Sequence, residues 1–140
     1  MLPLAKLQDE HAELVEIVQR LRAVVALDTP PESGALQALR NELATAVITH
    51  LQAEDWLMYP GLLDSGDPAL VEVARRFNAE MGSLARTFLD YCERWMPRSV
   101  IGNWTAFCHE TRVITDLLVE RIEREDRELY PLLKPLDRAA

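Results

Sequence analysis

The feature that most constrains the fold is a run of apolar residues at helical spacing that also carries a histidine and a glutamate. Between residues 36 and 57, apolar residues recur every three or four positions, as on one face of an α-helix: Leu36, Leu39, Leu43, Val47 and Leu57. His50 and Glu54 lie on the same face, one helical turn apart. Because an unpaired buried charge is costly, both side chains need a partner, either a metal ion or a hydrogen-bonded neighbour.

A second stretch repeats this design near the C-terminus. The segment from Glu54 reads EDWLMYPGLL, and the segment from Glu125 reads EDRELYPLLK. Glu-Asp and Tyr-Pro recur at identical spacing, a pair of leucines follows in both, and the alignment places His50 opposite Arg121. We interpret the two stretches as an internal repeat of one helix end. Tyr59 and Tyr130 are expected to cover the polar layer rather than to do chemistry.

Composition favours an all-α protein with one domain spanning residues 1–140. Half of the residues are apolar (49%) and a quarter are charged (27%), as in soluble globular domains, while glycine is sparse. The net charge of −8 argues against nucleic acid and anionic membranes as partners. The N-terminus lacks the basic and apolar regions of a signal peptide, so the cytoplasm is the expected location. Two cysteines, Cys92 and Cys108, do not make a disulfide scaffold, and we expect them to pack as free thiols.

Helical periodicity and turn residues divide the chain into four long helices. The first runs from about Leu4 to Leu27, and the second from near Ser33 to Tyr59 or just past Pro60. The third opens at residues 67–68, with aspartate as N-cap and proline in the first turn, and it ends before residue 97. The fourth begins after residue 102, capped by Asn103, or a few residues earlier at Ser99. Short loops between long helices predict an up-down-up-down antiparallel four-helix bundle.

That topology predicts that five polar residues meet. His11 lies on the apolar face of the first helix, and Arg121 and Glu125 lie on that of the fourth. Together with His50 and Glu54, each stands roughly 10–20 Å from the same end of the bundle. Two imidazoles with carboxylates suit iron, manganese or zinc, and two histidines with one carboxylate is the set of non-haem Fe(II). A buried network without metal, in which Arg121 pairs with both glutamates, explains the same residues.

These residues resemble a known family. QDEHAEL around His11, HLQAEDWLMYP around His50 and Glu54, and EREDRELYP around Glu125 are similar to the hemerythrin-like, or HHE cation-binding, domains. The resemblance implies a four-helix bundle in which five histidines and two bridging carboxylates hold two iron ions that bind or sense oxygen, nitric oxide or iron. By resemblance, His11, His50 and Glu54 match ligands, and Glu125, rather than Asp126, matches the second bridging carboxylate.

The chain departs from this family pattern at the ligands of one iron. Where the third helix of the family offers two histidines, this chain has Phe77 and Met81, and where the fourth offers one it has Arg121. The apolar residues would fill the vacated volume, and Arg121 puts a permanent cation near the position of the lost iron. A normal di-iron oxygen carrier is therefore not expected.

Three functions remain open at this point. The first is a metal-binding module with one mononuclear iron on His11, His50, Glu54 and Glu125, in sensing or buffering, with a small diatomic molecule as its ligand. The second is a metal-free bundle with a structural or partner-binding role. The third, ranked last, is a mononuclear iron oxygenase or peroxidase. Trp56 lies off the apolar face and is expected on the surface, where a homodimer or a protein partner would contact it.

Overall fold

The computed structural model describes residues 3–139, and within that range it contains helices and no β-strand. The all-α expectation is confirmed. The elements in order are α1 (Leu4–Val25), α2 (Ser33–Gln52), η1 (Ala53–Met58), α3 (Tyr59–Leu63), α4 (Pro68–Met81), α5 (Leu84–Arg94), α6 (Pro97–Gly102), α7 (Trp104–Arg124), η2 (Glu125–Leu129) and α8 (Tyr130–Ala139). Helix α2 runs on without a break through η1 into α3, and α7 runs on through η2 into α8. None of the described helices is both long enough and apolar enough to cross a membrane.

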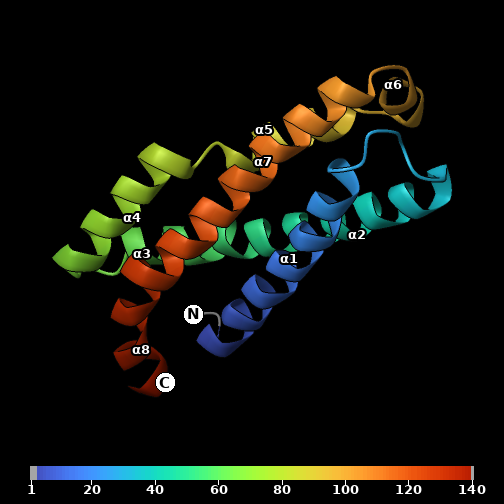
Figure 1. Cartoon of the computed structure of the whole chain (residues 1–140). Helices are drawn as coiled ribbons and strands as arrows, with labels where there is room; N and C mark the ends of the chain where they lie inside the picture. The colour runs from blue at the N-terminus through green and yellow to red at the C-terminus, as the bar shows by residue number, and fades with distance from the viewer. Residues whose placement is uncertain (1–2, 140) are drawn as a thin grey trace.

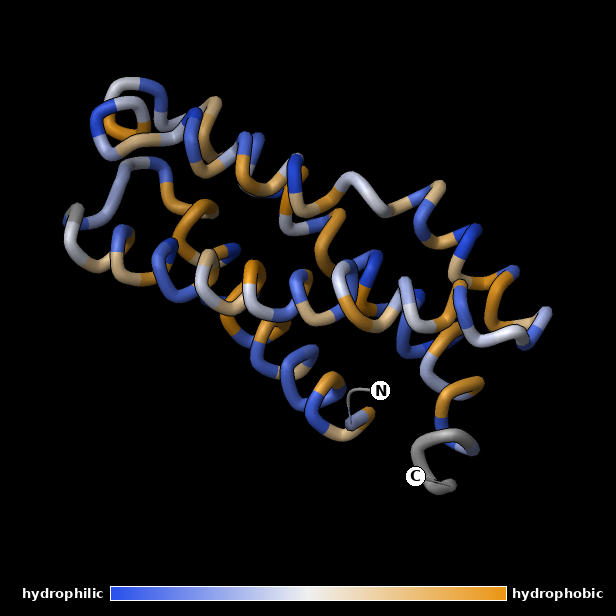
Figure 2. The backbone as a smooth tube through the Cα atoms, turned by 180° about the vertical axis from the view of Figure 1, so that it is seen from behind, coloured by the Kyte–Doolittle hydropathy of each residue, from blue (hydrophilic) through white to orange (hydrophobic). Residues whose placement is uncertain are grey.

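The long helices surround a shared core. Helix α1 packs against α2 and α7, and α5 packs against the same two helices (Figure 1). Hydrophobic and hydrophilic residues alternate along the helices, as Figure 2 shows, because each helix buries one face and exposes the other. The start of α1 contacts α8 at the other end of the chain, so that residues far apart in the sequence meet at one end of the molecule.

A buried polar layer separates two apolar clusters. The larger cluster includes Leu14 of α1, Val47 of α2 and Leu118 of α7. The smaller one includes Leu7, Met58 and Leu129 from the same three helical runs. The polar residues that the sequence singled out lie between these positions in each run: His11, His50, Glu54, Arg121 and Glu125. The layer therefore lies inside the molecule, where its charges depend on one another for compensation.

Both copies of the repeat form π-helices, which the sequence analysis did not predict. The amide of Tyr59 bonds to the carbonyl of Glu54, and that of Tyr130 to the carbonyl of Glu125, five residues back in both cases. In each copy a proline follows, and its ring would clash with the carbonyl four residues earlier in a regular α-helix. The wider π turn relieves that clash, and turns of this kind are frequent at functional sites.

The π turn overturns one burial prediction. Leu57 was expected on the buried face, but its side chain is 62% exposed, while Met58 is 2% exposed. Because a π turn holds one more residue than an α turn, the face that points inward shifts by one position. The neighbouring Trp56 is 69% exposed, as expected.

The sequence analysis treated the third helix as continuous, but the structure shows that it is interrupted. Helix α4 ends at Met81 and α5 begins at Leu84, with Gly82 between them. A side chain at Gly82 would place its Cβ atom 2.4 Å from the carbonyl oxygen of Asn78, so this close turn requires glycine. The break ends the α4 ladder, and the Met81 carbonyl at its end accepts a hydrogen bond from Arg121 Nη1 at 3.4 Å.

Of the two helix N-caps predicted from the sequence, one is confirmed and the other is not. Asp67 caps α4, since its side chain accepts a hydrogen bond from the amide of Ala69 at 3.0 Å, as expected. The fourth long helix starts after Asn103, but the Asn103 side chain makes no capping hydrogen bond. The short helix α6 before it was not foreseen. Cys92 and Cys108 are both free thiols.

Candidate metal centre

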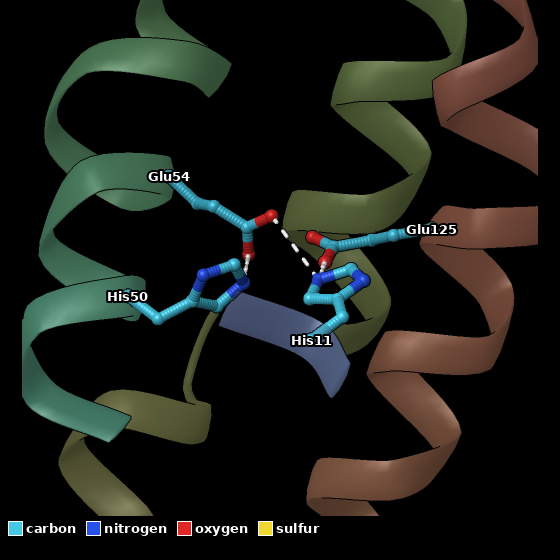
Figure 3. A group of neighbouring side chains, drawn as sticks. All are labelled: His11, His50, Glu54 and Glu125. Carbon is cyan, nitrogen blue, oxygen red and sulfur yellow. Dashed lines mark hydrogen bonds and ion pairs between the residues drawn. The ribbon is translucent and has the colours of Figure 1, made fainter. Parts of the chain in front are cut away.

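Four side chains from three helical runs converge in the polar layer. His11 comes from α1, His50 from α2 and its continuation supplies Glu54, while Glu125 comes from η2 (Figure 3). Each residue offers one ligand atom, and these four atoms all lie within 4.8 Å of one another. All four residues are buried, with exposed fractions of 3% or less. The structure thus brings together the four residues that the sequence proposed as ligands.

The two histidines direct the same ring nitrogen into the cluster. Nε2 of His11 lies 3.1 Å from Glu125 Oε1 and 3.8 Å from Glu54 Oε2. Nε2 of His50 lies 3.2 Å from Glu54 Oε1, yet it makes no hydrogen bond with any described residue. A buried ring nitrogen beside a carboxylate must carry a proton or share that carboxylate with a cation. The arrangement therefore suits a cation between the donor atoms.

The outward nitrogens of both histidines are bonded to acidic side chains. His11 Nδ1 donates to Asp126 Oδ1 at 2.8 Å, and His50 Nδ1 donates to Glu10 Oε1 at 2.7 Å. A carboxylate on Nδ1 orients the ring and leaves Nε2 free to bind, which is the usual second shell of a metal-ligating histidine. Sequence analysis missed Glu10, and its only signal was its place next to His11, off the apolar face. Asp126 is here a partner of His11 rather than a member of the four-residue cluster.

The repeat tyrosines cross between the two copies. Tyr59 donates a hydrogen bond to Glu125 Oε2 at 2.6 Å, and Tyr130 donates to Glu54 Oε2 at 2.7 Å. Each tyrosine thus holds the glutamate of the other copy. Tyr130 also stacks on the His11 ring, with its hydroxyl 3.0 Å from Nε2. The two tyrosines cover the layer, as expected, and in addition fix the orientation of both carboxylates.

Arg121 bonds to the same two carboxylates. Its Nη2 lies 3.1 Å from Glu54 Oε1 and 2.6 Å from Asp55 Oδ1, and its Nε lies 3.3 Å from Glu125 Oε2. The guanidinium is buried. Asp55 was not considered in the sequence analysis, although the repeat aligns it with Asp126. The aspartates differ in role, because Asp55 binds Arg121 while Asp126 binds a histidine.

The surroundings of Arg121 do not suit a second metal with histidine ligands. Phe77 is buried there, its ring 6.5 Å from that of Tyr59, and Met81 is partly buried beside it. The sequence contains three histidines, and the third, His109, is exposed on α7. The five-histidine set of the family therefore cannot be assembled in this chain. The residues present fit one metal ion, with a guanidinium beside it.

Burial and mutual attraction shift the pKa of every acid and base in the cluster. Burial alone would lower the pKa of His11, but Glu125 and Glu54 outweigh it and raise the pKa to about 10. The pKa of His50 is raised for the same reason, chiefly by Glu54. Burial would raise the pKa of Glu54, but His11 and His50 hold it well below its usual value. Burial and repulsion by Glu54 raise the pKa of Glu125 to about 7. The cluster thus attracts positive charge, as protons or as a metal ion.

Fold and site together define a helical protein with a buried cation-binding donor set. Comparison with protein families matches residues 2–133 to the hemerythrin HHE cation-binding domain. The chain therefore belongs to the hemerythrin HHE cation-binding family, as the resemblance had indicated. Neither the comparison with curated proteins nor that with solved structures found a match.

Proposed function

We propose that this protein binds a single divalent metal ion, iron, through His11, His50, Glu54 and Glu125. The observation that carries the proposal is the buried Nε2 atom of His50, which makes no hydrogen bond with the described residues and faces a cluster of donors within 4.8 Å of one another. Its nearest acidic atom is Glu54 Oε1 at 3.2 Å, and a proton or a metal ion must balance the charge of that carboxylate. Two imidazoles with carboxylate oxygens are the donor set of non-haem iron.

The balance of charge in the layer supports a dication. Arg121 makes its shortest contact with Asp55, at 2.6 Å, and these two charges compensate each other. Glu54 and Glu125, both fully buried, then need positive charge from elsewhere, which protons on the histidines supply when no metal is bound. One divalent ion balances them, whereas two would face the fixed charge of Arg121 a few ångströms away. The site is thus reduced to one metal.

The reduced site supports a role in sensing or buffering rather than oxygen transport. Oxygen carriage in the resembled family uses two bridged irons, and Arg121 stands in place of a ligand of the second. Iron in the remaining half-site would supply an open coordination position for a small diatomic ligand. The outer carboxylates of Glu10 and Asp126 would keep both rings aligned, and Tyr59 and Tyr130 would hold the two glutamates.

The proposal includes an up-down-up-down arrangement of four helices and a cytoplasmic location. The packing of α1 and α5 against both α2 and α7, together with membership of the family, supports this topology. The acidic composition supports the absence of nucleic-acid and membrane partners. The exposed Trp56 is the position at which a second copy or a protein partner would bind.

A metal-free role is the second candidate, and one observation favours it. Arg121 already contacts both glutamates at 3.1 and 3.3 Å, which neutralises part of their charge without a metal. In that case the layer only stabilises the fold, and the protein has a structural or partner-binding function. The two candidates differ in whether the purified protein holds metal.

Elemental analysis of protein expressed with added iron tests the proposal. We expect about one iron ion per chain, and loss of at least 90% of it in His50→Ala, since removing one of four donors opens the site. His109→Ala is the matched control, because that histidine is exposed on α7, and it should retain the metal. Iron-free wild-type protein would favour the metal-free candidate.

A further inference from the structure

Two adjoining hollows lie at the end of the molecule away from the metal centre. Their volumes are about 150 and 340 Å³, and Gln37, Arg40 and Pro97 line both. The larger hollow opens between the start of α2 and the segment around α6, which lies beside the α1–α2 loop in Figure 1, and the smaller hollow lies between α2 and α5. Arg40 stands ten residues before His50 in α2, or about 15 Å along the helix axis.

The guanidinium of Arg40 has aromatic neighbours but no anionic partner among the described residues. It lies 5.3 Å from the centroid of the Phe107 ring and 5.8 Å from that of Tyr91. Its Nε atom is buried and makes no hydrogen bond with any residue that the structure describes, and no described carboxylate forms an ion pair with it. The nearby Tyr91 hydroxyl is already engaged with Thr111 Oγ1 at 2.6 Å. A guanidinium at a cavity wall whose charge is balanced by no described carboxylate favours an anion from outside the chain.

Apart from Gln37, the rest of the larger hollow is apolar. Its wall is formed mainly by prolines and aliphatic residues: Pro30, Pro31, Leu36, Val100 and Ile101. Among the described residues that line the two hollows, Arg40 is the only charged one. Arg40 thus places a positive charge at this hollow in a protein whose net charge is −8. A ligand that fits must therefore combine one negative group with an apolar body.

We propose that this hollow binds an apolar monocarboxylate, with its carboxylate on Arg40 and its apolar part against Pro30, Pro31 and Ile101. An arginine fork matches a carboxylate with two parallel hydrogen bonds, and the aromatic rings behind it hold the guanidinium in place. A volume of about 340 Å³ equals that of roughly ten water molecules in the liquid. The ligand accordingly has on the order of ten non-hydrogen atoms. The site is separate from the metal centre and does not depend on metal.

Isothermal titration calorimetry with three probes tests the chemistry. Octanoate represents an aliphatic carboxylate and phenylacetate an aromatic one, while octanamide has the shape of octanoate without its charge. We expect saturable one-site binding of at least one acid, with a Kd below about 1 mM, and binding of octanamide at least about tenfold weaker. The acid that binds tighter identifies the aliphatic or aromatic class. Absence of saturable binding for both acids, or equal binding of octanoate and octanamide, would overturn the proposal.

Variants locate the site. Arg40→Gln should weaken acid binding by about tenfold or more, because it removes the charged donor. Arg75→Gln makes the same change on the exposed face of α4 and should leave the Kd unchanged. Ile101→Glu alters a 63% exposed wall residue and should weaken binding by charge repulsion, which covers the case that Arg40→Gln does not fold by circular dichroism. Unchanged affinity in folded Arg40→Gln, or in Ile101→Glu, would contradict the assignment.

Discussion

At the scale of single residues, the two buried glutamates divide their oxygens among several partners. Glu54 Oε2 accepts from Tyr130, while its Oε1 faces His50 and Arg121. Glu125 Oε2 accepts from Tyr59 and Arg121, while its Oε1 faces His11. Each carboxylate is therefore held from three directions, which fixes its geometry before any ligand binds. Preorganisation of this kind reduces the cost of binding a cation.

Removing Arg121 should destabilise the metal-free protein strongly. Arg121→Ala would leave Glu54, Glu125 and Asp55 without their buried cation, and breaking a buried pair in this way costs about 3–5 kcal/mol. Urea denaturation of chelator-treated protein at pH 7 measures the loss. The matched control is Arg127→Ala, which removes an arginine 68% exposed from the neighbouring π-helix and should change stability by less than about 0.5 kcal/mol.

The same variant separates the two candidate functions. If a metal binds beside Arg121, loss of that positive charge should strengthen iron binding and restore part of the stability when iron is added. If the layer is purely structural, iron should make no difference to the Arg121→Ala melting temperature. A thermal melt with and without iron therefore distinguishes the two.

Glu10 allows a test of the outer partners. Because its carboxylate orients the His50 ring at 2.7 Å, Glu10→Ala should reduce iron affinity about 10–100-fold while leaving the helix intact. Competition with a chelator of known affinity gives the magnitude. Glu13→Ala, an exposed glutamate one turn further along α1, should not alter the affinity. Equal affinities in both variants would mean that Glu10 does not support the ligand.

At the scale of elements, the π-helices set which residues face inward. Each lies at the junction where a proline prevents a regular turn, and each begins at or one residue before a site glutamate. Glu54 and Glu125 stay in the polar layer, while the wider turn shifts by one position which of the following residues face inward. The break at Gly82 also affects the polar layer, because it leaves the Met81 carbonyl free to accept a hydrogen bond from Arg121.

Paired truncations test the shifted register. Met58→Ala should cost about 2–5 kcal/mol, because it empties a buried site in the smaller apolar cluster. Leu57→Ala removes the adjacent apolar side chain, which is 62% exposed, and should change stability by less than about 0.5 kcal/mol. Chemical denaturation compares the two. The opposite order would mean that the helix continues as a regular α-helix through this stretch.

At the scale of the whole molecule, stability should depend on the protonation of the polar layer that divides the core. In the folded metal-free protein the carboxylates raise the pKa of His11 from 6.5 to about 10, so folding favours the protonated ring. That contribution is fully present below pH 6.5 and is lost as the pH rises through about 10. His50 changes in the same direction. Glu54, whose pKa is lowered, loses its contribution at the acidic end, below its unfolded value of 4.5.

We therefore expect the free energy of unfolding of the metal-free protein to fall between pH 6.5 and 10, by on the order of a few kcal/mol. Urea denaturation across this range measures the decline. His11→Gln should show a shallower slope, whereas His109→Gln, at an exposed position, should follow the wild type. Iron affinity should rise over the same range, because the metal displaces the proton on His11. A stability independent of pH over this range would contradict the assignment.

The sequence by itself determined what lies within single helices and between the two repeat copies. The four-residue spacing of His50 and Glu54 puts them on one helix face whatever surrounds them. The repeat alignment likewise showed that Arg121 stands opposite His50. The all-helical class follows from such local periodicity, whereas the residues that stand in place of a second metal's ligands were identified from the resemblance to the hemerythrin family.

Only the tertiary structure decided the contacts between helices. These contacts depend on how each helix is rotated and placed against its neighbours. They include the crossed bonds from Tyr59 and Tyr130, the bond from His50 to Glu10, and the position of Arg40 away from every described carboxylate. Helical periodicity sets the direction in which a side chain points from the axis of its own helix. It does not determine which residue that side chain meets across the core, because this depends on how whole helices pack against one another.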